Sequence, residues 1–129
     1  MSHTAKIPNV NINDLDALER AAADLGLELV RDQKTYKTYS VQKCDHAIRH
    51  QTDRNMYELG VLKEGDHFKL MQDTFMGGKG MVEVLGGHEA PKLNQSYAAQ
   101  VAMAHYQNEG WNVTTSKLED GSIVLRALN

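Results

Sequence analysis

The sequence predicts an α+β fold built on a mostly antiparallel sheet. Two segments carry apolar residues at helical spacing, and each ends at a glycine that is followed by an alternating strand pattern. Between them lies a hairpin pattern, in which two alternating strands flank a turn. We expect about six or seven strands, with two helices packed on one face of the sheet because each helix has a single apolar stripe. The shared order of helix, glycine, strand and returning strand also allows a pseudo-duplication of a helix-plus-hairpin unit.

The first half of the chain contains the first predicted helix. Residues 4–10 have the pattern of a short edge strand. A helix is predicted over residues 13–25, where Asn13 or Asp14 can cap the first turn by accepting a free backbone N–H. Gly26 is expected to end this helix in the left-handed conformation. Further strands are expected at 27–29, around 34–40 and at 44–50.

The second half contains the central hairpin and the second helix. Residues 57–70 alternate on both sides of a turn at 63–66. A helix is predicted from residue 92 to 109, because Pro91 suits its first turn and Gly110 suits its end. Its apolar stripe comprises Leu93, Tyr97, Val101 and Ala104. A last hairpin is expected from strands at 111–115 and 123–127, joined by a turn at 119–122.

Length and composition indicate one ordinary soluble domain covering residues 1–129. Apolar residues make up 41% of the chain and charged residues 24%, which argues against intrinsic disorder. Cys44 is the single cysteine, so no intrachain disulfide can form. The apolar runs are far shorter than the ~20 residues of a membrane-spanning helix, and no signal-peptide pattern is present. We therefore expect a location in the cytoplasm or the plastid stroma.

The basic charge is concentrated in one segment, although the net charge of the chain is −3. Residues 31–54 hold six basic and three acidic side chains, so this segment is +3 and the remainder is −6. Lysine and arginine neutralise phosphates, and tyrosine rings stack on unpaired bases. The candidates for nucleic-acid binding are Lys34, Tyr36, Lys37, Tyr39, Lys43, Arg49 and Arg54. The alternative interpretation is a solvated hairpin whose tyrosines are packing residues.

A glycine-rich segment follows the central hairpin. Glycines let backbone N–H groups approach an anion, and a lysine adds positive charge, but the spacing is that of neither a Walker A loop nor a dinucleotide fingerprint. The simplest interpretation is a flexible connection between the hairpin and the second helix. The alternative is a mobile loop that a partner orders. The candidate binding residues are Phe75, Gly77, Gly78, Lys79 and Gly80.

The sequence offers no catalytic constellation and little support for a metal site. Cys44, His46 and His50 would share one face of a strand, and zinc favours such ligands. An extended strand would nevertheless separate the first and last of these side chains by ~20 Å, from a rise of ~3.3 Å per residue. Serines lack the glycine-elbow context of a nucleophile. We expect no catalytic residue, no cofactor and no bound metal.

Several short motifs together resemble a known family. They are Asp14-Leu15-Asp16-Ala17-Leu18 leading to Leu25-Gly26, the central Tyr57-Glu58-Leu59-Gly60-Val61, Gln95-Ser96-Tyr97-Ala98, and the final Asp120-Gly121-Ser122-Ile123-Val124-Leu125, after an opening Met-Ser-His. The set is similar to the domain of unknown function 1257 family, also described as a hypothetical chloroplast reading frame, whose members occur in cyanobacteria, algal plastids and bacteriophages.

The resemblance implies a small, soluble, standalone protein, in the host cytoplasm for phage members, with no established activity, cofactor or catalytic residue. Family members tend to have tryptophan soon after the acidic residue that closes the central hairpin. Here Asp73 is followed by Thr74-Phe75-Met76, so any functional surface at that corner is altered.

The sequence therefore predicts a non-enzymatic interaction module that binds a protein partner or its own copy and does not enter a membrane. It would use a sheet face that the helices leave uncovered, or the loop at 74–90. The first alternative is a nucleic-acid-binding module acting through residues 31–54. The second alternative is a small enzyme or metal-binding protein.

Overall fold

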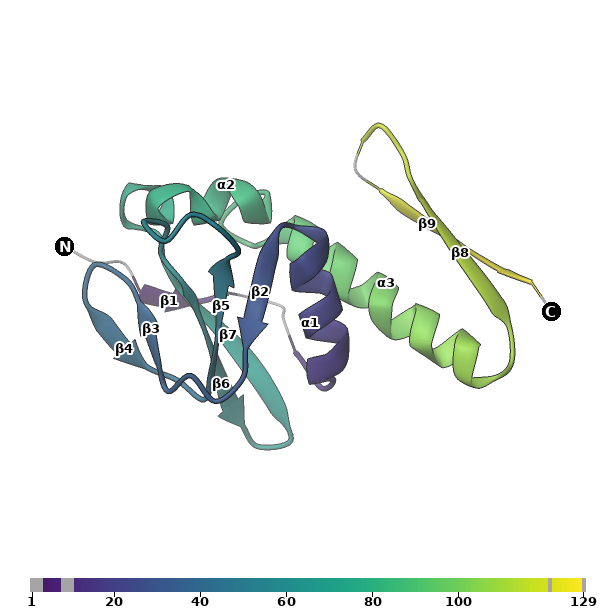
Figure 1. Ribbon diagram of the computed structural model, residues 1–129, viewed down its shortest axis with the longest axis horizontal. Helices are drawn as coiled ribbons and strands as arrows, with labels where there is room; N and C mark the ends of the chain where they lie inside the picture. The colour runs from purple at the N-terminus through teal and green to yellow at the C-terminus, as the bar shows by residue number, and fades with distance from the viewer. Residues whose placement is uncertain (1–3, 8–10, 121, 129) are drawn as a thin grey trace.

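The computed structural model describes residues 4–7, 11–120 and 122–128 and has an α+β architecture (Figure 1). A five-stranded sheet has the order β1–β7–β6–β5–β2. Its strands are β1 (Thr4–Lys6), β2 (Leu27–Val30), β5 (His46–His50), β6 (Leu59–Glu64) and β7 (His67–Asp73). Two separate hairpins pair β3 (Thr35–Lys37) with β4 (Val41–Lys43), and β8 (Asn112–Lys117) with β9 (Ile123–Leu128). The helices are α1 (Leu15–Asp24), α2 (Met81–Leu85) and α3 (Pro91–Asn108).

The predicted fold class is confirmed, since all strand pairs among the described residues are antiparallel. The strands are distributed differently from the expected single sheet of six or seven. The two small hairpins pair only within themselves, so the main sheet has five strands. The two halves share an order of elements but not a pairing, because β2 joins β5 in the main sheet whereas β8 pairs with β9 alone. The last part of the strand predicted at 4–10 lies outside the described residues.

The local signals at the helix ends act as predicted. The Asp14 carboxylate accepts a hydrogen bond from the Ala17 backbone N–H at 3.1 Å and caps α1. Gly26 and Gly110 follow the two long helices with φ of +76° and +87°, the left-handed conformation that a side chain disfavours. Pro91 occupies the first turn of α3, where a missing N–H costs little.

One face of the main sheet packs against the helices and forms the larger core. Alternation along the strands sends Ile48, Leu59, Val61 and Leu70 to this face, where they are buried. The helical side chains in the same cluster include Leu18, Ala21 and Ala22 of α1, Met81 and Leu85 of α2, and Leu93 of α3. Burial of these side chains supplies the main stabilising term of the fold.

The opposite face of the sheet is covered in part by the β3–β4 hairpin. Tyr36 of β3 is 2% exposed and clusters with Cys44 and Ala47, while Leu62 and Met71 of the sheet pack against them. The sequence predicts that the helices leave this face to solvent or to a partner. The hairpin partly replaces such a partner, because it lies across the sheet and pairs with none of its strands.

The glycine-rich segment has regular structure, contrary to the simplest interpretation of a flexible connection. Residues Phe75–Gly80, which we call the glycine turn, form a short helical turn that leads directly into α2. Gly86 and Gly87, with φ of +88° and +141°, then redirect the chain toward α3. Each glycine supplies a backbone conformation that residues with side chains rarely adopt.

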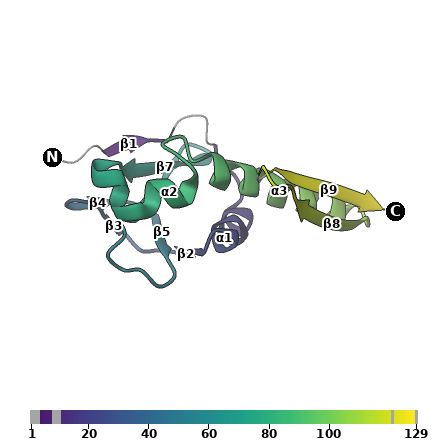
Figure 2. The same cartoon turned by 90° about the horizontal axis from the view of Figure 1, so that it is seen from above.

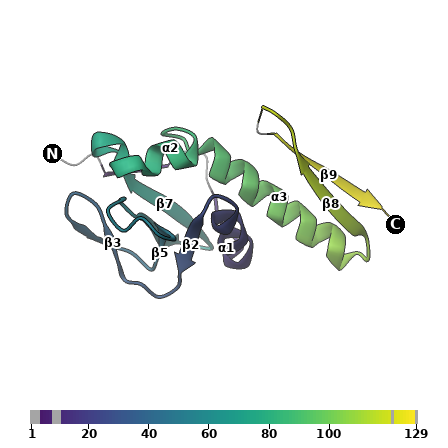
Figure 3. The ribbon, with the colours of Figure 1, turned by 45° about the horizontal axis from the view of Figure 1, so that its top comes forward.

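The C-terminal part of α3 and the β8–β9 hairpin form an arm that projects from the rest of the molecule (Figures 2 and 3). The predicted stripe of α3 enters the core at Leu93, but Val101 is 39% exposed. Ala99 is the last buried residue, and none of the described residues after it is buried. The reason is geometric, since the helix is longer than the surface on which it packs. Among the described residues, no helix has both the length and the apolar character to span a membrane.

Candidate functional site

An aromatic pair, formed by the exposed Tyr39 and the half-buried Phe75, joins two segments that are distant in the sequence. Tyr39, at the tip of the β3–β4 hairpin, contacts Phe75 of the glycine turn with ring centroids 5.4 Å apart and planes at 83°. Such an edge-to-face geometry is favourable for aromatic rings. Tyr39 is 63% exposed, and the neighbouring Val41 and Met76 are each 67% exposed. We call Tyr39, Val41, Phe75 and Met76 the aromatic corner.

A buried carboxylate holds the two halves of the aromatic corner together. Asp73, at the end of β7, is 2% exposed. Its Oδ2 accepts a hydrogen bond from the Tyr39 N–H at 3.2 Å, and its Oδ1 accepts one from the Phe75 N–H at 2.9 Å. One side chain therefore fixes the backbone beneath both rings, and charge-assisted bonds of this kind are stronger than neutral ones.

The glycine turn itself is left-handed. Met76, Gly77, Gly78 and Lys79 have φ of 53°, 65°, 62° and 57°. Left-handed helical geometry costs a residue with a side chain about 1–2 kcal/mol, so Met76 and Lys79 are strained. The turn is held in place by a hydrogen bond from the Tyr57 N–H to the Gly78 carbonyl at 3.0 Å. Strain of this kind clusters at functional sites.

The sequence-predicted loop residues thus fall into two groups. Phe75 belongs to the aromatic corner, and Lys79 is exposed three residues after the corner's Met76. Gly77, Gly78 and Gly80 form the backbone support; Gly78 is buried, and a Cβ there would lie 3.1 Å from the Asp73 carbonyl oxygen. Asp73, Val41 and Met76 were not among the predicted site residues. The signal for Asp73 is local, because an aspartate two residues before a turn accepts backbone N–H bonds readily.

Two tyrosines near the corner are packing residues. Tyr36 is buried, and desolvation raises its pKa to about 12, with smaller contributions from Cys44 and Asp73. Tyr57 is 5% exposed, and its pKa is also raised, mainly by burial and then by the Asp73 carboxylate. A buried ring cannot stack on a base. Tyr36 is therefore removed from the candidates for nucleic-acid binding, whereas Tyr39 stays accessible.

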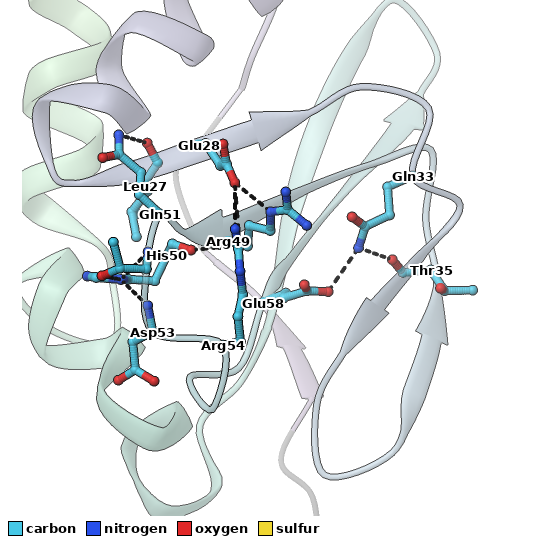
Figure 4. Close-up of polar contacts among 11 residues, drawn as sticks. Leu27, Glu28, Gln33, Thr35, Arg49, His50, Gln51, Asp53, Arg54 and Glu58 are labelled. Atoms are coloured by element: carbon cyan, nitrogen blue, oxygen red, sulfur yellow. Dashed lines mark hydrogen bonds and ion pairs between the residues drawn. The ribbon is translucent and has the colours of Figure 1, made fainter.

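The arginines of the basic segment are engaged by the protein itself (Figure 4). Arg49 Nε donates to Glu28 Oε1 at 2.6 Å, and Arg54 Nη2 reaches the same oxygen at 3.3 Å. The hydrogen bond from Arg49 is the main reason that the pKa of Glu28 is lowered, and Arg54 contributes to it. Arg31 likewise lies 2.6 Å from Asp16. Much of the positive charge counted in residues 31–54 is thus neutralised by acidic residues, some of them in α1 and β2.

The lysines of the basic segment and of the glycine turn form fewer contacts with acidic side chains than the arginines do. Lys34 lies 3.9 Å from Asp32, and Lys37 Nζ donates to the Arg54 carbonyl at 2.8 Å. Lys43 and Lys79 are exposed and form no ion pair within the described part of the chain. Lys37 borders the tip that carries Tyr39, and Lys43 lies in the same hairpin, opposite Thr35 at its other end. The positive charge left over is therefore close in sequence to the aromatic corner.

The potential metal ligands face different partners. The Cys44 thiol donates to the Gln33 carbonyl at 3.2 Å, and burial is the main cause that raises its pKa to about 11. His46 Nδ1 accepts the Asp32 N–H at 2.9 Å, and His50 Nδ1 accepts the Asp53 N–H at 2.9 Å. Within the described ranges, no three histidine, cysteine, aspartate or glutamate side chains are grouped as a metal site would require.

Comparisons with known proteins bear on the family alone. Neither the curated proteins nor the solved structures include a significant match. A family model described as "Protein of unknown function (DUF1257)" matches residues 21–125, which cover β2 to β8, the aromatic corner and the first half of β9. The match extends over most of the chain and agrees with the resemblance seen in the short motifs. The chain belongs to the DUF1257 family.

Proposed function

We propose that this protein is a non-enzymatic interaction module that binds a protein partner through the aromatic corner. The observation that carries the proposal is the exposed Tyr39 ring, which packs on the half-buried Phe75 and is fixed from below by the buried Asp73. Preorganised, exposed aromatic and methionine side chains are enriched at protein interfaces. A rigid support also reduces the entropy that binding must overcome.

The strain in the glycine turn supports the same proposal. Met76 is both left-handed and 67% exposed, so its side chain contributes little to the core. A glycine would satisfy this backbone at a lower conformational cost. A contact between the Met76 side chain and a partner protein explains why methionine occupies this strained, exposed position. Methionine adapts its shape to an apolar partner surface.

The charge near the corner indicates the chemistry of the partner. Lys37, Lys43 and Lys79 are exposed, and no carboxylate lies in ion-pair range of them among the described residues. Complementary charge steers association and selects partners. We therefore expect a protein segment with an apolar anchor for the corner and acidic residues beside it.

Affinity purification with a matched control tests this function. The tagged protein would be recovered from its native cell with nuclease treatment, together with a Tyr39→Ala/Met76→Ala variant and a Leu118→Ala control. Leu118 is 52% exposed and lies at the turn of the β8–β9 hairpin, far from the corner in the sequence. We expect one near-stoichiometric protein with the native chain and the control, and at least tenfold less with the corner variant. Equal recovery by all three proteins contradicts the proposal.

Nucleic-acid binding is the second candidate function, and one observation favours it. Tyr39 is accessible at the tip of the hairpin that also carries the exposed Lys37 and Lys43, so one ring and two cations could meet a single strand. The paired arginines weigh against this function. Fluorescence anisotropy with a labelled single-stranded oligonucleotide distinguishes it, because phosphate binding weakens steeply with salt. Micromolar affinity at low salt that Tyr39→Ala reduces would favour this candidate over a protein partner.

A further inference from the structure

The arm formed by the C-terminal part of α3 and the β8–β9 hairpin carries exposed apolar side chains but has no core of its own. Its apolar residues include Val101, Tyr106, Leu118, Val124 and Leu128, which are 37–57% exposed. A two-stranded hairpin is marginally stable by itself, and the outer edges of β8 and β9 pair with no other described strand. The arm thus exposes several apolar side chains that none of the other described residues covers.

The hairpin has two different faces. Ile123, Leu125 and Ala127 of β9 are half-buried, and Ile123 lines the space next to α3. The intervening Val124, Arg126 and Leu128 point to the opposite face because side chains alternate along a strand. Arg126 forms no ion pair with any described residue. We call this face, with two apolar side chains around one cation, the outer β9 face.

A groove of about 570 Å³ runs along another side of α3. Its apolar lining comes from Tyr97, Ala98, Val101, Ala102 and Tyr106, and Asp14 lines it from the segment before α1. The Tyr97 hydroxyl accepts hydrogen bonds from the Asn13 and Asp14 N–H groups at 3.0 and 3.2 Å, which fixes the acidic end of the groove. We call this feature the α3 groove.

The outer β9 face and the α3 groove are complementary in character. The outer β9 face presents Val124 and Leu128 on either side of the Arg126 cation. The α3 groove presents an apolar lining with the Asp14 carboxylate at one end. The total accessible surface of the chain, 7352 Å², also exceeds the roughly 6,800 Å² of a compact 14.4 kDa monomer. The excess of about 550 Å² agrees with an arm that the rest of the chain leaves exposed.

We infer that a second copy of this chain covers the exposed apolar side chains of the arm. In the inferred two-fold dimer, the outer β9 face of each copy lies in the α3 groove of the other, and Arg126 approaches the partner copy's Asp14. A two-fold arrangement makes this contact twice and leaves no open end for further growth. The surface is separate from the aromatic corner, which lies at the other end of the molecule (Figure 1).

Sedimentation velocity on the full chain, over a hundredfold concentration range, tests the dimer. We expect a concentration-dependent dimer for the native chain. Val124→Lys, on the outer β9 face, and Val101→Lys, in the α3 groove, should each weaken dimerisation at least tenfold. Gln107→Lys adds the same charge at an exposed position of α3 that does not line the groove, and it should dimerise normally. Circular dichroism of each variant checks that the fold is retained.

A mixture of the two weakened variants tests the exchange of contacts. The heterodimer of Val124→Lys with Val101→Lys retains one intact contact, because the unchanged β9 face of the second meets the unchanged groove of the first. One lysine buried in the apolar contact should already abolish that contact, so a second lysine in the same contact costs little more. The mixture, which keeps one intact contact, should therefore dimerise more strongly than either variant alone. A native chain that stays monomeric throughout, or a folded Val101→Lys variant that dimerises like the native chain, overturns the inference. A mixture that is no stronger than its components overturns the exchanged geometry.

Discussion

The ring of Tyr36 lies directly against the backbone of Gly60. A Cβ atom at Gly60 would stand 2.4 Å from Tyr36 Cε1, a separation that real structures do not tolerate. Gly60 lies in β6, opposite Met71 of β7 and Ala47 of β5. The absence of a side chain there lets the β3–β4 hairpin approach the sheet. The same approach brings Tyr39 to Phe75, so the aromatic corner depends on this glycine.

Replacing Gly60 by alanine should destabilise the protein. The added methyl group must displace the Tyr36 ring or the strand, and overpacking of a close-packed interior costs about 1–3 kcal/mol. Urea unfolding measures the loss. Tyr36→Leu in both backgrounds provides a double-mutant cycle, which isolates the contact between the two residues. A Gly60→Ala variant as stable as the native chain would contradict the placement of the hairpin.

Met76 should reveal a conflict between stability and binding. Met76→Gly relieves the left-handed strain, and after the entropic penalty of glycine we expect a gain of about 0.5–1 kcal/mol in unfolding free energy. The matched control is Met76→Ala, which removes the long side chain but keeps the strain. Both variants should lose partner recovery, and only the glycine variant should gain stability. Equal unfolding free energies for the two variants would show that the turn is not left-handed.

The sequence predicts the features that depend on neighbouring residues. Asp14 caps α1, and Gly26 and Gly110 end the long helices, because each signal acts within a few residues. Tyr36 and Tyr39 could not be separated in this way. Whether a tyrosine is buried or exposed here depends on Gly60 and Phe75, more than twenty residues away.

The basic segment illustrates the same limit. Counting charges over residues 31–54 correctly locates the cations, but the acids that neutralise Arg31 and Arg49 are Asp16 in α1 and Glu28 in β2. Those pairs form because β2 and β5 are neighbours in the sheet and α1 leads into β2. Strand order is not encoded in local spacing, so the candidate site could be predicted only as two separate segments.

Cys44 should be unreactive in the folded protein. Its thiol is buried, and its pKa is raised from 9.0 to about 11, mainly by desolvation. The thiolate is the nucleophile, so two pKa units reduce the reactive fraction at pH 8 by about a hundredfold. Alkylation by iodoacetamide, monitored by mass spectrometry, should be about a hundredfold or more slower in the folded protein than in urea.

The Gly60→Ala variant provides an internal comparison, because a loosened hairpin should accelerate alkylation of Cys44. Equal rates in the folded and unfolded native chain would contradict the burial of Cys44.

Glu28 should give the protein a component of acid sensitivity. Arg49, with help from Arg54, lowers the pKa of Glu28 below its ordinary value of 4.5. A carboxylate whose folded pKa is lowered stabilises the native state above the unfolded pKa, and this contribution is lost as the pH falls through the folded value. Glu28→Gln removes the titration, so the unfolding free energy of this variant should fall less between pH 5 and pH 3 than that of the native chain.

Glu119→Gln is the control, since Glu119 is exposed and forms no ion pair with a described residue. Parallel pH profiles for the native chain and Glu28→Gln would mean that the Arg49–Glu28 pair does not persist in solution.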